Sequence, residues 1–364
     1  MIEKQKMFSF NRTYKLPFKY KVQNDALIYI HQNSIFKRYL KFLKRYFIVH
    51  FLRQHSLELG NINKKYKNIL WVNISAPSFG DSLMDLSSRV LLQDKNVDLF
   101  TNIADSDIYL EDKIFSNVFT DKKLIDQKKY NLVILDSYST RSLKVKFDIA
   151  PSTPFVGMYG FYNGPDINRT LFSFHRLNHL LGYINTEKRI NEIAKPSLTI
   201  SENDKALVKV LNLPTKYIVV ALGGEWPFRT FTKWDALLKK LLYEDNNLNI
   251  VIVGSSNGGH SAKIIMDQFE NFNVYDCVSQ FSFTQTAYII KKGEVLFCCD
   301  GGLMHAACAV DTCIIPLFAR VNQQMRLTNS TNAYPLFDNK DVNNINTEDI
   351  YKKYLEAKEF LNQP

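Results

Sequence analysis

An apolar run, Val295–Cys299, leads directly into Asp300–Gly302, and this junction constrains the chain more than any other feature. The run is typical of a buried strand in a parallel sheet, and Leu303–Ala309 after it predicts a helix. Paired glycines let the backbone approach a ligand closely, and a helix N-terminus presents N–H groups and a positive dipole end to a phosphate. Asp300 and His305 are therefore expected to face one crevice at the carboxyl edge of the sheet, where ligands bind. A tight turn in which Asp300 caps the helix is the alternative.

Strand-like and helix-like segments alternate from Asn68 onward, which predicts an α/β protein with βαβ units and parallel sheets. The strands are expected at Ile69–Ile74, Val97–Thr101, Leu132–Leu135, Tyr217–Leu222, Asn249–Val253, Val295–Cys299 and Cys313–Phe318. The helices are expected at Ser82–Gln93, Phe174–Gly182, Thr232–Tyr243, Ser261–Asn271, Thr284–Lys292, Leu303–Ala309 and Thr347–Leu361. Residues 151–165, which are rich in Pro and Gly, are expected to be irregular.

A chain of 364 residues exceeds the usual size of one domain, so we expect two. The boundary is placed at residues 190–212, where Ile193–Thr199 is typical of a linker. The expected division is a basic extension (1–66), an N-terminal α/β domain (67–195), a C-terminal α/β domain (196–345) and a final helix (346–364).

The positive charge is concentrated at the N-terminus. Residues 1–68 hold 15 Lys or Arg and 3 Asp or Glu, whereas the remainder is nearly balanced, with 31 and 33. Residues 34–55 predict a basic amphipathic helix, with apolar residues at helical spacing (Phe36, Tyr39, Leu40, Leu43, Tyr46, Phe47, Phe51) and cations between them (Lys37, Arg38, Lys41, Lys44, Arg45). Such a helix fits an anionic membrane surface, and the alternative is a helix packed on the body with its basic face in solvent. Nucleic acid is not an expected partner, because the rest of the chain carries no basic patch.

No apolar run reaches the roughly 20 residues of a membrane-spanning helix, and the first 20 residues lack the pattern of a signal peptide. The five cysteines lie mostly inside apolar runs and without metal-ligand spacing: Cys277, Cys298, Cys299, Cys308 and Cys313. We therefore expect buried, reduced thiols in a cytoplasmic protein.

Two more turns of interest follow predicted strands. Ser75–Asp81 follows the first strand, and its Asp81 is either a helix cap or a carboxylate that is free to accept a proton. Gly223–Trp234 follows the first strand of the second half, and its cations Arg229 and Lys233 suit a diphosphate.

Together these segments resemble the bacterial heptosyltransferases, glycosyltransferase family 9, over roughly residues 67–320. In that family the first strand ends in a loop that closes on Gly-Asp, as Gly80-Asp81 does here, and a mid-chain strand is matched by Asn131–Asp136. The family's most specific stretch, Asp-Ser/Thr-Gly-x-x-His followed by a small-residue helix and a strand, is matched by Asp300–Ala309 and Cys313–Ala319. The resemblance implies a GT-B fold, in which two Rossmann-like domains, for acceptor and donor, face each other across a cleft.

The resemblance also implies roles for individual residues. Asp81 stands at the position of the general base, with Gly80 beside it on the acceptor side. Arg229 stands where the family has a Lys on the donor diphosphate, Asp300 where it holds the donor sugar, and Phe281 where an apolar residue meets the nucleobase. The full set implied on the donor side is Gly224, Glu225, Arg229, Lys233, Phe281, Asp300, Gly301, Gly302, Leu303 and His305.

The chain departs from the family pattern around the donor. Gly301 replaces Ser or Thr and removes a hydroxyl, although the backbone amides of Gly301–Leu303 are still expected to receive the phosphates. Arg229 replaces Lys, Phe231-Thr232 replaces Trp-Pro, and Ala319-Arg320 replaces Gly-Pro. These changes bear on the identity of the donor more than on the fold.

The implied reaction is inverting transfer of heptose from ADP-heptose to a lipopolysaccharide or lipooligosaccharide core. Arg229 or Lys233 and a helix N-terminus would neutralise the departing diphosphate, so no metal or other cofactor is expected. The one Asp-x-Asp, Asp105-Ser106-Asp107, is predicted to lie in a surface loop. The implied partners are an ADP-heptose-like donor and a lipid-linked glycan, at the inner face of the cytoplasmic membrane. Two alternatives stay open: a relative that binds a nucleotide sugar or partner without turnover, and a transferase acting on a protein or another glycan.

Overall fold

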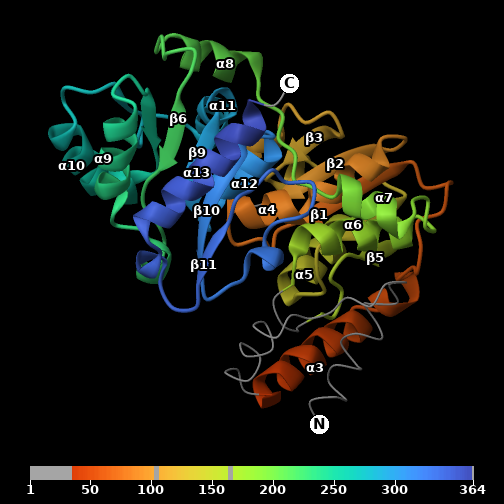
Figure 1. Ribbon diagram of the computed structural model, residues 1–364. Coiled ribbons are helices and arrows are strands. Elements are labelled where there is room, and N and C mark those ends of the chain that lie inside the picture. The colour runs from red at the N-terminus through yellow and green to blue at the C-terminus, as the bar shows by residue number, and fades with distance from the viewer. Residues whose placement is uncertain (1–34, 102–105, 163–166, 363–364) are drawn as a thin grey trace. The chain divides into compact units, whose positions relative to one another are not determined.

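The computed structural model describes residues 35–101, 106–162 and 167–362. The chain forms two compact units, Met1–Lys195 and Pro196–Pro364 (Figure 1). Each unit is built around one parallel sheet, so the predicted fold class is confirmed at this level. The functional borders predicted at residues 66 and 345 remain predictions.

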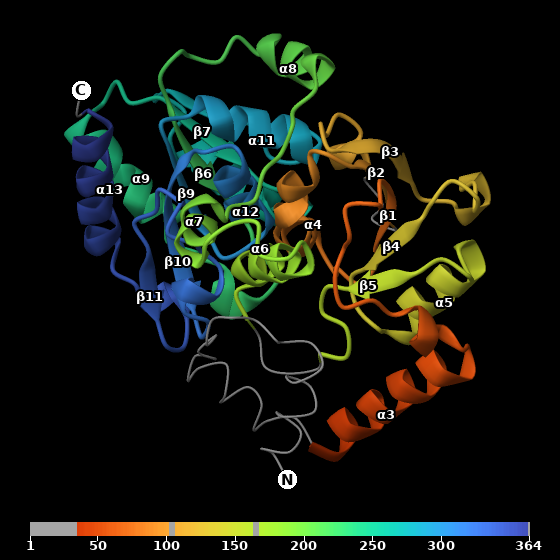
Figure 2. The ribbon, with the colours of Figure 1, turned by 90° about the vertical axis from the view of Figure 1, so that its right-hand side faces the viewer.

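The first unit contains a five-stranded sheet with the order β3-β2-β1-β4-β5. Its strands are β1 (Asn68–Asn73), β2 (Asn96–Thr101), β3 (Phe115–Phe119), β4 (Leu132–Leu135) and β5 (Phe155–Gly157). Its helices are α3 (Ile35–Phe51), α4 (Phe79–Asp85), α5 (Thr140–Ile149), α6 (Arg169–Leu180) and α7 (Glu187–Ile193). One face of the sheet packs with α3 and α5, whereas α4 and α6 pack on each other and on the 3-10 turn η2, Ser87–Leu92 (Figure 2).

The second unit contains a six-stranded sheet with the order β11-β10-β9-β6-β7-β8. Its strands are β6 (Ile218–Ala221), β7 (Ile250–Val253), β8 (Val274–Asp276), β9 (Val295–Cys299), β10 (Cys313–Ala319) and β11 (Leu336–Asp338). Helices α9 (Trp234–Glu244), α10 (Gly259–Gln268) and α13 (Thr347–Leu361) cover one face. Helices α8 (Glu202–Lys209), α11 (Phe283–Lys292) and α12 (Gly302–Ala309) cover the other (Figure 2).

Both sheets have the doubly wound strand order, and in each of them the first and fourth strands are neighbours. In the first unit β1 pairs with β4, and in the second β6 pairs with β9. The chain leaves β1 through α4 and β4 through α5, on opposite faces, and it leaves β6 and β9 through α9 and α12 in the same way. At such a switch point the two connections diverge and open a crevice at the carboxyl edge of the sheet.

The predicted central strands and the helices of the second half are confirmed within a few residues. The sequence missed the short strands β3, β5, β8 and β11 and the helices α5, α7 and α8. The predicted helix Ser82–Gln93 was wrong in both bounds, because Ser78 caps α4 three residues before Asp81 and the helix gives way to η2 after Asp85.

Both capping alternatives were wrong as well. Ser78, and not Asp81, is the N-cap of α4, where its hydroxyl accepts the Asp81 N–H. Gly301 is the N-cap position of α12, and no side chain caps that helix, so Asp300 is not its cap.

The predicted helix at residues 34–55 is α3, which is followed by the 3-10 turn η1, Gln54–Leu57. One face packs on the first unit through Phe42, Tyr46 and Val49. Arg45 is buried and donates to the carbonyl of Tyr162 at 2.8 Å, so its assignment to a solvent-facing basic side was wrong.

The opposite side of α3 exposes large apolar residues, namely Phe36, Tyr39, Leu40, Phe47 and Phe51. Lys37, Lys41 and Lys44 are exposed on the same helix. We call these eight residues the α3 outer face. The helix therefore has two apolar sides rather than one. Residues 1–34 lie outside the described residues, and no described helix is long and apolar enough to cross a membrane.

The five cysteines are buried free thiols, as predicted. Burial raises the pKa of Cys299 and Cys308 to about 12 and that of Cys277 and Cys313 to about 11. The described structure therefore gives them no reactive, thiolate-like environment.

Lys146 on α5 is fully buried and joins the segment after α3 to the body of the first unit. Its ammonium donates to the side-chain oxygen of Gln54 and to the carbonyl of Pro151 (3.2 Å), and it lies 5.1 Å from the Phe155 ring centroid. Burial lowers its pKa from 10.5 to about 8.

Lys146→Met is expected to remove one component of the pH dependence of stability. The depressed pKa means that the folded chain binds fewer protons than the unfolded chain between pH 8 and 10.5, so this lysine makes stability rise with pH in that window. Urea unfolding from pH 7 to 10 should show the wild type gaining stability relative to the variant as pH rises. Exposed Lys128→Met is the control, and parallel curves for wild type and Lys146→Met would contradict the depressed pKa.

Candidate functional site

The switch point of the second unit brings Asp300 and Arg229 together. Asp300 follows β9, and its N–H donates to the Leu317 carbonyl at 3.1 Å, which continues the pairing with β10. The Asp300 side chain is only 3% exposed, and its Oδ2 lies 3.1 Å from a terminal nitrogen of Arg229 and 3.6 Å from Nε of Arg326. Two guanidinium groups thus compensate one buried carboxylate at this edge.

A tight turn after β6 positions Arg229. Gly223 has a φ of +86°, which favours glycine, and a Cβ on Gly224 would lie 2.3 Å from Oγ1 of Thr230. Glu225 is largely exposed and lies 3.7 Å from Arg229, too far to hold it firmly. Nε of Arg229 is buried without a hydrogen-bond partner among the described residues, so the guanidinium keeps an unused donor.

The start of α12 lies one residue beyond Asp300. Gly301 is extended, with a φ of 178° that any residue adopts. An added Cβ would come no closer than 3.9 Å to a protein atom at Gly301 and 3.7 Å at Gly302. Packing within the protein therefore does not require glycine at either position, and the first N–H groups of the helix have no intrahelical acceptors.

The other predicted donor-side residues differ in how deeply they are buried. His305 is buried one turn into α12, and Leu303, also on α12, is partly buried against the core that α11 and α12 share. Phe281 lies in the loop before α11, partly buried against the same core. Lys233 is directed elsewhere, because its ammonium donates to the Asn343 carbonyl at 2.7 Å.

Arg326 is a site residue that the sequence did not reveal. It follows the 3-10 turn Gln323–Met325, with a side chain 15% exposed, and no motif marks it. Arg320 was noted from the sequence only as a departure from the family pattern. Its guanidinium stacks 3.8 Å from the ring centroid of Phe228, the residue that precedes Arg229.

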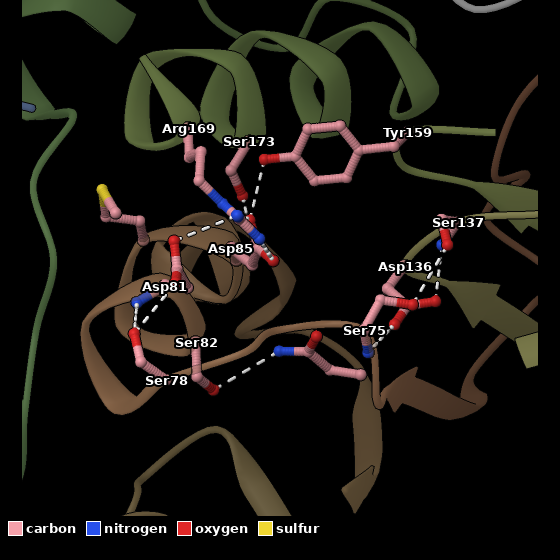
Figure 3. Close-up of polar contacts among 12 residues, drawn as sticks. Ser75, Ser78, Asp81, Ser82, Asp85, Asp136, Ser137, Tyr159, Arg169 and Ser173 are labelled. Carbon is pink, nitrogen blue, oxygen red and sulfur yellow. Dashed lines mark hydrogen bonds and ion pairs between the residues drawn. The ribbon is translucent and has the colours of Figure 1, made fainter. Parts of the chain in front are cut away.

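The switch point of the first unit is closed by Asp136, directly after β4. Its carboxylate accepts the backbone N–H groups of Ser75 (2.7 Å) and Ser137 (2.5 Å) (Figure 3). It also accepts the backbone N–H of Ile74 at 2.8 Å. Burial raises the pKa of Asp136, and these hydrogen bonds oppose the rise. Asp136 thereby fixes the start of the loop that leads from β1 to α4.

Asp81 lies in the first turn of α4, with its side chain 25% exposed, and Gly80 is buried beside it. One carboxylate oxygen accepts the Ser78 hydroxyl at 2.9 Å, and the other lies 3.0 Å from a terminal nitrogen of Arg169 (Figure 3). Arg169 also forms a bidentate ion pair with Asp85, one turn along α4. The sequence did not predict Arg169 or Asp85.

Among the described residues, no group of three or more His, Cys, Asp or Glu is arranged to hold a metal ion. Of the Asp-x-Asp pair, Asp107 lies in the 3-10 turn Ser106–Tyr109, and Asp105 lies outside the described residues.

A sequence model of glycosyltransferase family 9 (heptosyltransferase) matches residues 168–355, which is more than half of the chain. The chain belongs to glycosyltransferase family 9. It is therefore a glycosyltransferase, and the predicted family is confirmed. Comparison with curated protein sequences gives no significant match.

Solved structures of this family share the fold. A family 9 glycosyltransferase from Veillonella parvula is 13% identical, with a TM-score of 0.70 over 82% of this chain and 99% of its own. E. coli ADP-heptose lipopolysaccharide heptosyltransferase II is 17% identical, with a TM-score of 0.63 over 80% and 98%. E. coli heptosyltransferase WaaC with ADP is 15% identical, with a TM-score of 0.60 over 80% and 99%. The two parallel sheets thus match those of GT-B heptosyltransferases.

Two glycine substitutions test how the donor-side turns are built. Gly224→Ala places a Cβ against Thr230 and is expected to lower the free energy of unfolding by about 1–3 kcal/mol and to displace Arg229. Gly301→Ala has room, so its stability should stay within about 0.5 kcal/mol of wild type. Urea unfolding measures both, and equal losses would contradict this assignment of the two turns.

Proposed function

We propose that this glycosyltransferase is an inverting, metal-independent enzyme that moves heptose from ADP-heptose to a lipopolysaccharide or lipooligosaccharide core. The observation that carries the proposal is the Arg229–Asp300 pair at the second switch point, next to the start of α12. A cation, a buried carboxylate and free helix N–H groups at one sheet edge suit a sugar joined to a diphosphate.

The choice of donor follows the family relationship. The related E. coli enzyme WaaC has been solved with ADP and with ADP-2-deoxy-2-fluoro heptose. In this chain Arg229 takes the diphosphate, with the N–H groups of Gly301–Leu303, and Asp300 holds the sugar. The arginine fork compensates for the hydroxyl that Gly301 lacks, since it donates two parallel hydrogen bonds.

The reaction assigns one proton transfer to the first unit. The acceptor hydroxyl attacks the anomeric carbon as Asp81 takes its proton, and the bond from that carbon to the diphosphate oxygen breaks. Arg229 and the start of α12 stabilise the negative charge that grows on the leaving diphosphate. The configuration at the anomeric carbon is inverted because a single displacement occurs.

Asp81→Asn is expected to lower kcat by about 10²–10⁴-fold, because an amide cannot accept the acceptor proton. Donor affinity should be unchanged, since the donor groups lie in the other unit. Release of nucleoside diphosphate from ADP-heptose in the presence of acceptor measures kcat, and calorimetry measures affinity. Turnover within a few-fold of wild type would remove Asp81 from the mechanism.

Arg229→Ala is expected to weaken ADP binding by about 1.5–3 kcal/mol, through loss of charge-assisted hydrogen bonds. Lys233→Ala is the matched control, because the Lys233 ammonium already bonds to the Asn343 carbonyl and should matter less. Unchanged ADP affinity in Arg229→Ala, or a larger loss in Lys233→Ala, would move the diphosphate to other residues.

The acceptor proposed is a lipid-linked glycan, and the α3 outer face holds the enzyme at the inner face of the cytoplasmic membrane. Exposed aromatic residues on α3 insert at the headgroup level, and each nearby lysine adds about 1 kcal/mol on an anionic surface. The inner side of α3 is already bound to the first unit, so the helix needs no rearrangement to present its outer face.

Binding to vesicles containing anionic phospholipid should fall as salt rises, because charges are screened beyond roughly 8–10 Å. Replacing Lys37, Lys41 and Lys44 with Gln should release the protein, whereas the same change at Lys122, Lys123 and Lys128, exposed elsewhere in the first unit, should not. Co-sedimentation measures binding. A wild-type protein that ignores anionic vesicles at low salt would show that α3 is only a packing element.

A further inference from the structure

Arg169 joins the two acidic side chains of α4 and belongs to neither of the motifs discussed above. It is the first residue of α6, whose N-cap Asn168 accepts the Leu171 N–H at 3.0 Å. Its guanidinium lies 3.0 Å from Asp81 Oδ1, donates through Nε to Asp85 Oδ1 at 2.8 Å, and bonds through a terminal nitrogen to Asp85 Oδ2 (Figure 3).

The two carboxylates have different surroundings. The Asp85 side chain is 5% exposed, whereas that of Asp81 is 25% exposed. Tyr159, in the loop after β5, donates its hydroxyl to Asp85 at 2.7 Å, and burial together with the Asp85 charge raises its pKa, so it remains a neutral donor. Asp85 is thus a structural carboxylate, and Asp81 is the one that an acceptor can reach.

Contacts with other residues than Asp81 fix the position of the Arg169 side chain. Its guanidinium carbon lies 5.7 Å from the Tyr159 ring centroid, and that ring stacks on Phe172 at 4.7 Å. The Ser173 hydroxyl donates to the Asp85 carbonyl at 2.6 Å, which ties α6 to α4. Although burial opposes it, the Asp85 carboxylate raises the pKa of Arg169, so the group stays charged.

A general base must be ionised, well oriented and still basic. A lone arginine beside Asp81 would orient the carboxylate but reduce its basicity. Here the bidentate pair with Asp85 neutralises most of the guanidinium charge, and one N–H remains directed at Asp81. A carboxylate has about four acceptor positions, so the bonds from Arg169 and Ser78 leave room for an acceptor hydroxyl.

We propose that Arg169, fixed by Asp85 and Tyr159, is the positioning residue that orients Asp81 toward the acceptor hydroxyl. The inference rests on the proposed role of Asp81 as the base. Among the described residues, the charged or titratable side chains around Asp81 include Arg169 on α6, Asp85 on α4 and Tyr159 after β5. Tyr109 bonds to the neighbouring Ser82 at 2.7 Å.

The test is the pH dependence of kcat in two variants, which should change in opposite directions. In Asp85→Asn, Arg169 loses its main carboxylate partner, and its charge acts fully on Asp81. The acidic limb of the pH profile should then move to lower pH, and the plateau value of kcat should fall because Asp81 becomes a weaker base. In Arg169→Gln, Asp81 faces Asp85 without a cation, so the limb should move to higher pH, with a plateau about 10²-fold lower from lost orientation. The KM for the donor should stay within about 2-fold in both.

Asp112→Asn is the matched control. It breaks another buried ion pair of the first unit, Arg89–Asp112, whose side chains are 1% and 4% exposed, without touching Asp81. It should lower stability and leave the acidic limb in place. Arg169→Gln leaves the buried Asp85 carboxylate without its arginine and can therefore unfold. Asp85→Asn removes that carboxylate, so it still gives a decisive result in that case.

The outcomes separate this inference from the proposed function. If Asp81→Asn retains turnover, the proposed base is wrong and the positioning role falls with it. If Asp81→Asn is inactive while Asp85→Asn and Arg169→Gln keep the wild-type plateau and acidic limb, only the positioning role is overturned.

Discussion

The pairing of the first strand with the fourth in each sheet is the constraint on which the candidate site depends. Because β1 pairs with β4 and β6 with β9, two loops that are far apart in sequence begin side by side at the same sheet edge. The helices that follow diverge to opposite faces, and the backbone cannot fill the space between them. Asp136 in one unit, and Arg229 with Asp300 in the other, lie at these points.

Buried carboxylates determine which groups gather at and near the carboxyl edges of the two sheets. An isolated buried carboxylate is costly, so each one must be compensated by specific groups. Asp136 is compensated by three backbone N–H groups, and it fixes a loop. Asp300 and Asp85 are compensated by arginines, and the arginine at Asp85, Arg169, also pairs with Asp81. The same requirement is therefore met by backbone N–H groups at Asp136 and by arginine side chains at Asp300 and Asp85.

The sequence predicted the parts of this protein that are local. The central strands are continuous apolar runs, buried on both faces, and the turns after them carry residues whose chemistry follows from their place at a strand end. Edge strands such as β3 and β11 were not predicted, because they are only partly buried and their sequences contain no continuous apolar run. Helix α3 was predicted, but its apolar residues were assigned to a single side. Helical spacing alone does not show which of them pack on the first unit and which are exposed.

The arginines that contact Asp81 in the first unit and Asp300 in the second could not be predicted in the same way. Arg169 is 88 positions after Asp81, and Arg326 is 26 positions after Asp300, and neither stands in a motif. Their roles arise only when the sheets bring distant loops together. Conversely, Lys233 has the right charge in the right segment, yet its ammonium bonds to Asn343. The charge and spacing of the sequence identify the edge of the sheet where cations gather. Which of these cations pairs with Asp300 is decided by the contacts of the folded chain.

The most direct test of the account is where a nucleotide sugar protects the backbone. Hydrogen–deuterium exchange of the full chain, with and without saturating ADP-heptose, reports on the amides of both switch points. We expect protection at residues 223–230 and 300–305, the two turns at the β6–β9 edge. Protection confined to other segments, with these two turns unchanged, would contradict the placement of the donor at the second switch point.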